Sequence, residues 1–127
     1  MGFPFATETG TDRFRLRQTG RVAEGHYRPH QGLWLSSIGL GAYLGDHDDE
    51  TDRAVQAAVV RCVEAGVNVV DTAINYRCQR GERAVGAALR DLFESGRAGR
   101  EELVIATKGG FLPYDGTPPA RSADYFR

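Results

Sequence analysis

Three side chains in the sequence, those of Asp71, Tyr76 and Lys108, have the chemistry to act together in proton transfer. Asp71 ends a run rich in β-branched residues at positions 67–70, and Lys108 directly follows a second apolar run at 103–107. Ligands bind at the carboxyl ends of parallel strands, and neighbouring strands lie about 4.8 Å apart. If both runs are strands of one parallel sheet, the carboxylate and the ammonium can touch, with Tyr76 in the loop that leaves the same edge.

The chemistry that suits this set is donation of a proton to a carbonyl oxygen that is becoming an alkoxide. A free tyrosine, with a pKa of about 10, is a poor proton donor at neutral pH. A lysine cation nearby favours the phenolate and lowers that pKa, and an aspartate paired with the lysine keeps it charged and oriented. The same spacing also fits a structural Asp71–Lys108 ion pair with Tyr76 as a loop anchor, and the spacing leaves both interpretations open.

The surrounding pattern predicts the elements that must position these residues. Residues 1–13 are polar and rich in Gly and Thr, which predicts a loose tail, and residues 14–35 predict a β-hairpin region. Further strands are expected at 37–41, 67–70 and 103–107, with helices from the acidic stretch 46–50 to Gly66 and at 82–94. Strands that alternate with helices pair in parallel through right-handed crossovers, so we expect an α/β fold.

Composition excludes several classes of function. The 127 residues fit one ordinary domain, with 41% apolar and 26% charged residues and a formal net charge of −1. No basic run with interleaved aromatics indicates nucleic-acid binding, and no apolar run approaches the ~20 residues that span a bilayer. The start of the sequence lacks the pattern of a signal peptide, which favours a cytoplasmic location, and Cys62 and Cys78 have no metal-ligand spacing. We therefore expect no nucleic-acid, membrane or metal site.

The glycines at positions 39, 41 and 45 do not form a dinucleotide-binding fingerprint. The pattern G-x-G-x-x-G needs a third glycine at position 44, which is leucine, and the helix is expected to open later, near Asp48. The glycines still allow a tight turn and close approach of a ligand to the backbone at the end of a strand.

Taken together, the motifs resemble the aldo-keto reductase family over about residues 33–112. The resemblance lies in Asp71-Thr72-Ala73, Tyr76 and the stretch at 81–86, in the approach at 64–68, in Thr107-Lys108 after an apolar strand, and in Gly39-Leu40-Gly41-Ala42-Tyr43. Any one of these pieces alone would be weak, whereas the combination is specific. The family fold is an eight-stranded (β/α) barrel with an N-terminal hairpin that closes its bottom.

The resemblance implies both a fold and a reaction. The chain would hold the first three β/α units of a (β/α)8 TIM-type barrel after an N-terminal β-hairpin, an incomplete barrel in which residues 36–127 form the N-terminal part of the barrel domain. The reaction would be NADPH-dependent reduction of a small carbonyl compound, or oxidation of an alcohol, with NADH possible as cofactor. Tyr76 would be the general acid, Lys108 the residue that lowers its pKa, and Asp71 the partner of Lys108. Gly41, Ala42 and Tyr43, together with Asp71, would approach the cofactor.

The sequence departs from the family pattern in two main respects. No histidine follows Lys108, although the family has a catalytic histidine on its next strand, and the later strands that carry the family's main pyrophosphate and adenine-phosphate contacts are absent. A smaller departure is Arg77, which stands where many members have glycine. We therefore expect an N-terminal fragment that is inactive alone. The alternative is a non-catalytic binding or interaction module that keeps this part of the barrel and pairs through the edge of the strand at 103–107. The substrate and the oligomeric state are not determined by the sequence.

Overall fold

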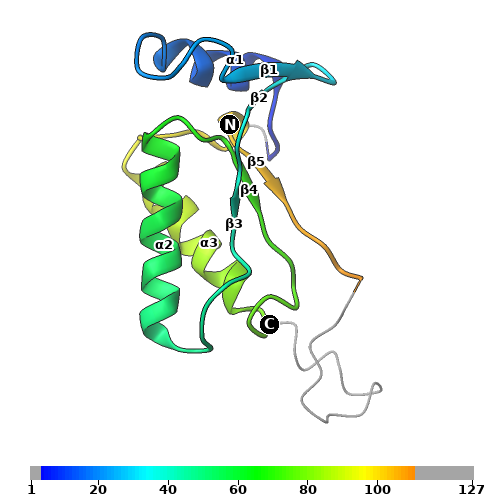
Figure 1. Cartoon of the computed structure of the whole chain (residues 1–127), viewed down its shortest axis with the longest axis vertical. Helices are drawn as coiled ribbons and strands as arrows, with labels where there is room; N and C mark the ends of the chain where they lie inside the picture. Colours follow the sequence, from blue (N-terminus) through cyan, green and yellow to red (C-terminus); the bar gives the residue numbers. More distant parts are fainter. Residues whose placement is uncertain (1–3, 111–127) are drawn as a thin grey trace.

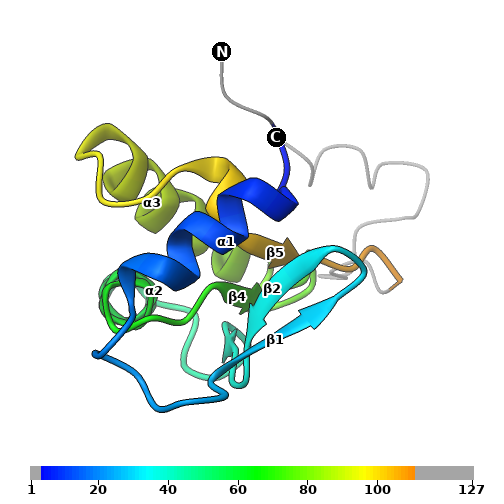
Figure 2. The same cartoon turned by 90° about the horizontal axis from the view of Figure 1, so that it is seen from above.

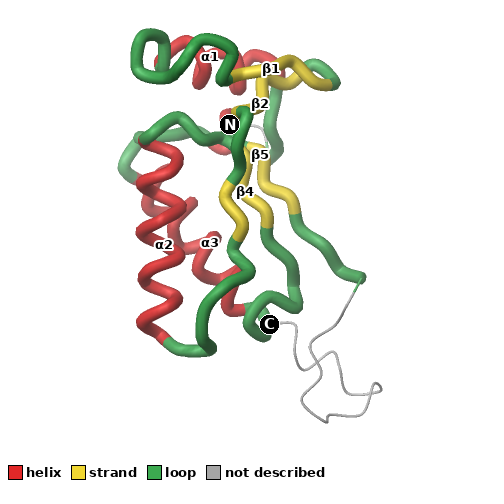
Figure 3. Tube along the Cα trace, viewed as in Figure 1, coloured by secondary structure: helices red, strands yellow, loops and turns green. Residues whose placement is uncertain are grey.

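A computed structural model describes residues 4–110 of the chain as an α/β fold. Residues 111–127 of the predicted barrel region lie outside the described part, as do residues 1–3 of the predicted tail. The elements, coloured by type in Figure 3, are α1 (Glu8–Arg17), β1 (Tyr27–His30), β2 (Leu33–Ser36), β3 (Leu40–Gly41), α2 (Asp49–Glu64), β4 (Val69–Asp71), α3 (Arg80–Glu94), the 3-10 turn η1 (Arg100–Glu102) and β5 (Val104–Ala106).

The central element is a parallel three-stranded sheet in the order β3-β4-β5. One register row joins Leu40, Val70 and Ile105, and the next row joins Gly41, Asp71 and Ala106. Both helices that follow the first two of these strands, α2 and α3, lie on one side of the sheet (Figure 1). Because the three strands are parallel, their carboxyl ends all face the same edge of the sheet.

Apolar periodicity and end signals explain where the two long helices lie. The Asp48 side chain accepts a hydrogen bond from the Thr51 backbone N–H at 2.7 Å and so caps α2 at its amino end. Gly66 follows the helix with a φ of 99°, which glycine adopts without steric penalty. In α3, Val85, Ala88 and Leu92 are buried, so one face of this helix covers the sheet.

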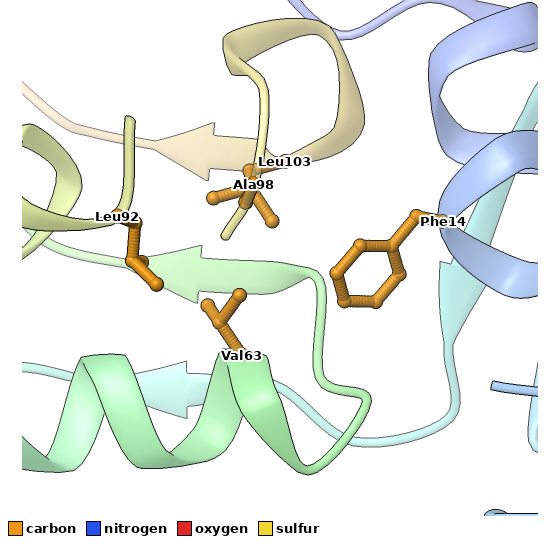
Figure 4. Packing of buried hydrophobic residues seen from close by; sticks show 5 residues of the cluster. All are labelled: Phe14, Val63, Leu92, Ala98 and Leu103. Atoms are coloured by element: carbon orange, nitrogen blue, oxygen red, sulfur yellow. The ribbon is translucent and has the colours of Figure 1, made fainter. Parts of the chain in front are cut away.

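The core has two connected parts. At the carboxyl half of the sheet, Val59, Val70, Val85 and Ala88 pack together with Ala42. The second part lies at the amino ends of the strands and consists of Phe14, Val63, Leu92, Ala98 and Leu103 (Figure 4). Phe14 comes from α1, so the N-terminal helix closes this end of the core.

The predicted loose tail at residues 1–13 is wrong for its described part. Helix α1 crosses the boundary that was expected between the tail and the hairpin region 14–35. Its amino end is capped by Thr7, whose hydroxyl accepts from the Gly10 N–H at 2.9 Å. Phe14 is its one buried large hydrophobic residue, so the helix has almost no apolar periodicity to signal it. Contacts with residues far away in the sequence stabilise it instead.

The main contact of this kind is with Glu102, whose side chain is only 2% exposed. Its carboxylate accepts from Arg13 Nε at 2.8 Å and from Arg17 Nη2 at 2.8 Å, both on α1. It also accepts from the Gly99 backbone N–H at 2.9 Å. A carboxylate of η1 therefore holds α1 against the sheet, and its burial is offset by charge-assisted hydrogen bonds.

The antiparallel pair β1–β2 forms a hairpin in which Pro29 lies opposite Trp34. Together with α1 it lies across the amino ends of the parallel strands, away from the loops that leave their carboxyl ends (Figures 1 and 2). The buried Asn68, directly before β4, joins the hairpin to the sheet: its Oδ1 accepts from Ser36 N at 2.8 Å and its Nδ2 donates to Trp34 O at 2.8 Å. The hairpin is thus fixed by a side-chain amide rather than by a shared strand.

Replacing Gly10 by alanine is expected to lower the free energy of unfolding by roughly 1–3 kcal/mol, because a Cβ here would lie 2.6 Å from the Glu101 carbonyl carbon. Urea unfolding measures the loss. Gly86→Ala is the matched control, since a Cβ there meets nothing within 4 Å; it removes a glycine from within α3 and should stabilise by roughly 0.5–1 kcal/mol. An unchanged stability of Gly10→Ala would contradict the close packing of α1 on η1.

Candidate active site

The ends of β4 and β5 bring Asp71 and Lys108 into contact. Beyond the strands the parallel ladder continues through Thr72 N–H to Ala106 O at 2.8 Å and Ile74 N–H to Lys108 O at 3.2 Å. Asp71 lies beside Ala106 in the register, and Lys108 is two residues further along, so both side chains stand on the same face. Lys108 Nζ donates to Asp71 Oδ1 at 2.7 Å and Oδ2 at 2.8 Å.

Tyr76 lies in the loop between β4 and α3, with its ring next to the same ammonium group. Lys108 Nζ is 4.8 Å from the centre of the Tyr76 ring, within the range of a cation–π contact. On another side the ring packs edge-on against Tyr43, with centroids 5.0 Å apart and an interplanar angle of 67°. The three residues singled out in the sequence therefore form one cluster at the carboxyl edge of the sheet.

The electrostatics of the cluster favour a charged lysine. The Asp71 carboxylate, and after it the Tyr76 hydroxyl, raise the pKa of Lys108 above its ordinary value. The pair is open to solvent, with side-chain exposures of 50% for Lys108 and 45% for Asp71. Ion pairs this exposed contribute at most about 1 kcal/mol to stability. As a structural ion pair, Asp71 and Lys108 would thus add little to the free energy of unfolding. The Lys108 cation is accessible to solvent beside the Tyr76 phenol, an arrangement that could support proton transfer.

The predicted cofactor residues fall into different environments. Gly41 is exposed, and a Cβ there would meet nothing within 4 Å, so a ligand can approach its backbone. Tyr43 is 62% exposed beside Tyr76. Ala42 is turned into the core and its N–H donates to Asp71 O at 2.9 Å, so its side chain is unavailable for contact with a ligand. Gly41, Tyr43 and Asp71 therefore lie at the open carboxyl edge of the sheet, whereas Ala42 does not.

Sequence reasoning did not identify several neighbours of the cluster. The Thr72 carbonyl accepts a third hydrogen bond from Lys108 Nζ at 2.8 Å, a backbone contact for which no residue type gives a signal. Thr107 donates its hydroxyl to Glu82 Oε1 at 2.6 Å and ties the chain before Lys108 to the first turn of α3. Arg77 is buried next to Tyr76 and pairs with Asp52 of α2.

Within residues 4–110, no group of three or more His, Cys, Asp or Glu side chains is placed to hold a metal ion. None of the helices in the same described part is both long and apolar enough to cross a bilayer.

The fold and the cluster define the class: an α/β protein with contacting Asp, Lys and Tyr side chains at the carboxyl edge of a parallel sheet. The model of the aldo/keto reductase family matches residues 37–125, and the chain belongs to this family. The matched segment contains Asp71, Tyr76 and Lys108.

Two named relatives are similar to this chain. One is described as 6-dehydroglucose reductase of Novosphingobium aromaticivorans, and it is 34% identical over 101 residues, which are 77% of this chain and 32% of that protein. The other, described as probable voltage-gated potassium channel subunit beta of Oryza sativa subsp. japonica, is 33% identical over 87 residues, which are 66% of this chain and 25% of that protein. The chain thus spans about a third and a quarter of the length of these relatives.

Proposed function

We propose that this chain supplies the first three β/α units of a (β/α)8 barrel which, when complete, is an NADPH-dependent oxidoreductase for small carbonyl or alcohol substrates. The observation that supports this most directly is the cluster at the sheet edge. Lys108 Nζ contacts both oxygens of Asp71 and lies 4.8 Å from the Tyr76 ring centre, within a segment matched to the aldo/keto reductase family.

In this proposal each of the three residues has a distinct task. Tyr76 donates its hydroxyl proton to the carbonyl oxygen of the substrate as negative charge develops there. The Lys108 cation stabilises the phenolate that Tyr76 becomes, and Asp71 fixes the position of the ammonium through its two oxygens. Gly41, Tyr43 and Asp71 would hold the nicotinamide end of NADPH, which supplies the hydride when bound.

The name of one relative bears on the substrate class. A 6-dehydroglucose reductase, by its name, reduces a carbonyl derivative of a sugar. We infer that a small, polar carbonyl compound is the substrate class to test first for this chain. NADH is the alternative cofactor.

The test is NADPH oxidation by the complete protein with a panel of aldehydes and ketones that includes sugar derivatives. We expect turnover by the complete protein and none by the 127-residue chain alone, which lacks the remaining strands of the proposed barrel. The proposal fails if the complete protein binds no NADPH and reduces none of the panel. Turnover of the 127-residue chain at the rate of the complete protein would contradict the part of the proposal that treats it as a fragment.

A second candidate is a non-catalytic interaction module. The observation that favours it is the relative described as a potassium channel subunit beta. Edge strands β3 and β5 would offer unpaired backbone groups to a partner chain. Size-exclusion chromatography combined with thermal unfolding of the 127-residue chain distinguishes the two candidates. A discrete oligomer with cooperative melting favours the module, whereas aggregation or partial unfolding favours the fragment.

A further inference from the structure

The turn directly after Tyr76 has an unfavourable backbone. Arg77, Cys78 and Gln79 have φ values of 51°, 52° and 69°, and none of them is glycine. Left-handed conformations of this kind persist in L-residues only when the surroundings fix them, and they concentrate at functional sites. Some contact must therefore hold this turn in place.

The side chain of Arg77 provides that contact. It is only 2% exposed, and its Nη1 donates to Asp52 Oδ1 of α2 at 2.6 Å and to the Asp46 carbonyl at 3.3 Å. Among the residues that the structure describes, Arg77 Nε and Nη2 are buried without a hydrogen-bond partner. Asp52 is therefore the group that compensates this buried charge in the described part of the chain.

The same carboxylate also holds the other end of the turn. Asp52 Oδ2 contacts Arg80 Nη2 at 2.8 Å, and Arg80 is the first residue of α3. Burial opposes ionisation of Asp52, but the hydrogen bonds from Arg77 and Arg80 outweigh it and lower the pKa of this carboxyl. The carboxylate is thus charged at neutral pH and clamps the turn at both ends to the first turn of α2.

The clamp is directly connected to Tyr76 and to its aromatic neighbour Tyr43. Arg77 is bonded to Tyr76 through the backbone, and the Tyr76 carbonyl accepts from the Gly81 N–H at 3.1 Å. Through Asp46 the guanidinium also reaches the loop that carries Tyr43, the residue that packs against the Tyr76 ring. Arg77 therefore connects the turn after Tyr76, helix α2 and the loop of the aromatic neighbour.

We propose that Arg77 and Asp52 are positioning residues that fix Tyr76 relative to Lys108 and thereby set the rate of proton donation. This inference rests on the proposed function, in which Tyr76 is the acid. Displacement of a catalytic group by about 1 Å can lower a rate by about 100-fold, so loss of the clamp should act on kcat rather than on binding.

The test compares two variants of the complete protein with a matched control. Arg77→Gly removes the guanidinium group. Because glycine tolerates a φ of 51°, the turn can keep its backbone conformation in this variant. Asp52→Asn keeps the shape but removes the charge. For both we expect kcat to fall about 10-fold or more, with KM for the aldehyde and Kd for NADPH changed less than about twofold. Asp49→Asn is the control, because Asp49 is 83% exposed and, among residues 4–110, forms an ion pair with Arg80 alone. The kcat of this variant should stay within about twofold.

A second readout does not depend on turnover. In protein labelled with fluorotyrosine, the Tyr76 signal, assigned through Tyr76→Phe, should shift or broaden in Arg77→Gly and Asp52→Asn but not in Asp49→Asn. The signal of Tyr27, at the opposite end of the sheet, should stay unchanged. The double variant should lose no more kcat than the worse single variant, because the two residues act as one unit.

The outcomes separate the two claims. If the unsubstituted protein reduces no carbonyl but the Tyr76 signal moves as described, the proposed function is wrong and the positioning of Tyr76 stands. If the Tyr76 signal keeps its place in both clamp variants, or if kcat is unchanged in both, the inference is overturned.

Discussion

Replacing Tyr76 by phenylalanine in the complete protein is expected to lower kcat for carbonyl reduction by roughly 10²–10⁴-fold, the usual contribution of a positioned general acid. The ring that packs against Tyr43 at 5.0 Å is kept, and only the hydroxyl is lost. NADPH affinity and the free energy of unfolding should therefore change little. Steady-state kinetics measure the loss of kcat, and a binding titration measures the affinity for NADPH.

Tyr27→Phe is the matched control for loss of a tyrosine hydroxyl. Tyr27, the first residue of β1, donates to the Gly66 carbonyl at 2.5 Å. Strand β1 lies at the end of the sheet away from the cluster (Figure 1). Its removal should reduce stability by about 1 kcal/mol and leave kcat within about twofold. If Tyr76→Phe kept more than about a tenth of the kcat, Tyr76 would not be the general acid.

The second large effect concerns stability, and its site is Glu102. Glu102→Ala should lower the free energy of unfolding by about 2–4 kcal/mol, because it removes charge-assisted hydrogen bonds to Arg13, Arg17 and the Gly99 N–H. The full penalty for breaking a buried pair, about 3–5 kcal/mol, is not expected, since the two arginines are 48% and 43% exposed and stay hydrated. Urea unfolding at neutral pH measures the loss, with the exposed Glu94→Ala as control.

The same residue predicts a pH dependence. Burial acts against ionisation of Glu102, but the hydrogen bonds from Arg17, Gly99 and Arg13 outweigh it and lower its pKa below the ordinary value of 4.5. A carboxyl with a lowered pKa in the folded state contributes stability above that ordinary value and loses it as the pH falls through the folded pKa. The difference in stability between the unsubstituted protein and Glu102→Gln should thus be largest at neutral pH and shrink in acid. An equal difference at both pH values would contradict the ion pairs.

The candidate site was more predictable than the N-terminal part of the fold. Asp71 and Lys108 each end a run of apolar residues, and parallel pairing alone then places them on one edge. Helix α1 gave no such signal, because it is held by Glu102, which lies 85 residues from Arg17. The burial of Arg77 could not be predicted from the sequence either. A charged residue in a loop is normally solvated, and its partner Asp52 lies 25 residues earlier.

The first residues of strand β4 and helix α3 differ from the predicted ones. Strand β4 begins at Val69 rather than at residue 67, because the Val67 N–H is bonded to Cys62 O at the end of α2 and Asn68 is engaged with the hairpin. Helix α3 begins at Arg80, two residues before Glu82, where the helix was predicted to start.

The bonds of Asn68 also have a consequence for the order of folding. Its partners in the hairpin and in η1 lie 32 to 34 residues away, at Trp34, Ser36 and Glu102. Contacts between segments so distant in the sequence require a long loop to close first, and they form more slowly than local turns and helices. The hairpin can therefore form early by itself, whereas its docking on Asn68 is expected later, together with the pairing of β4 and β5, whose partners are 35 residues apart. Docking of the hairpin and formation of the parallel sheet are accordingly expected to be coupled in one late step of folding.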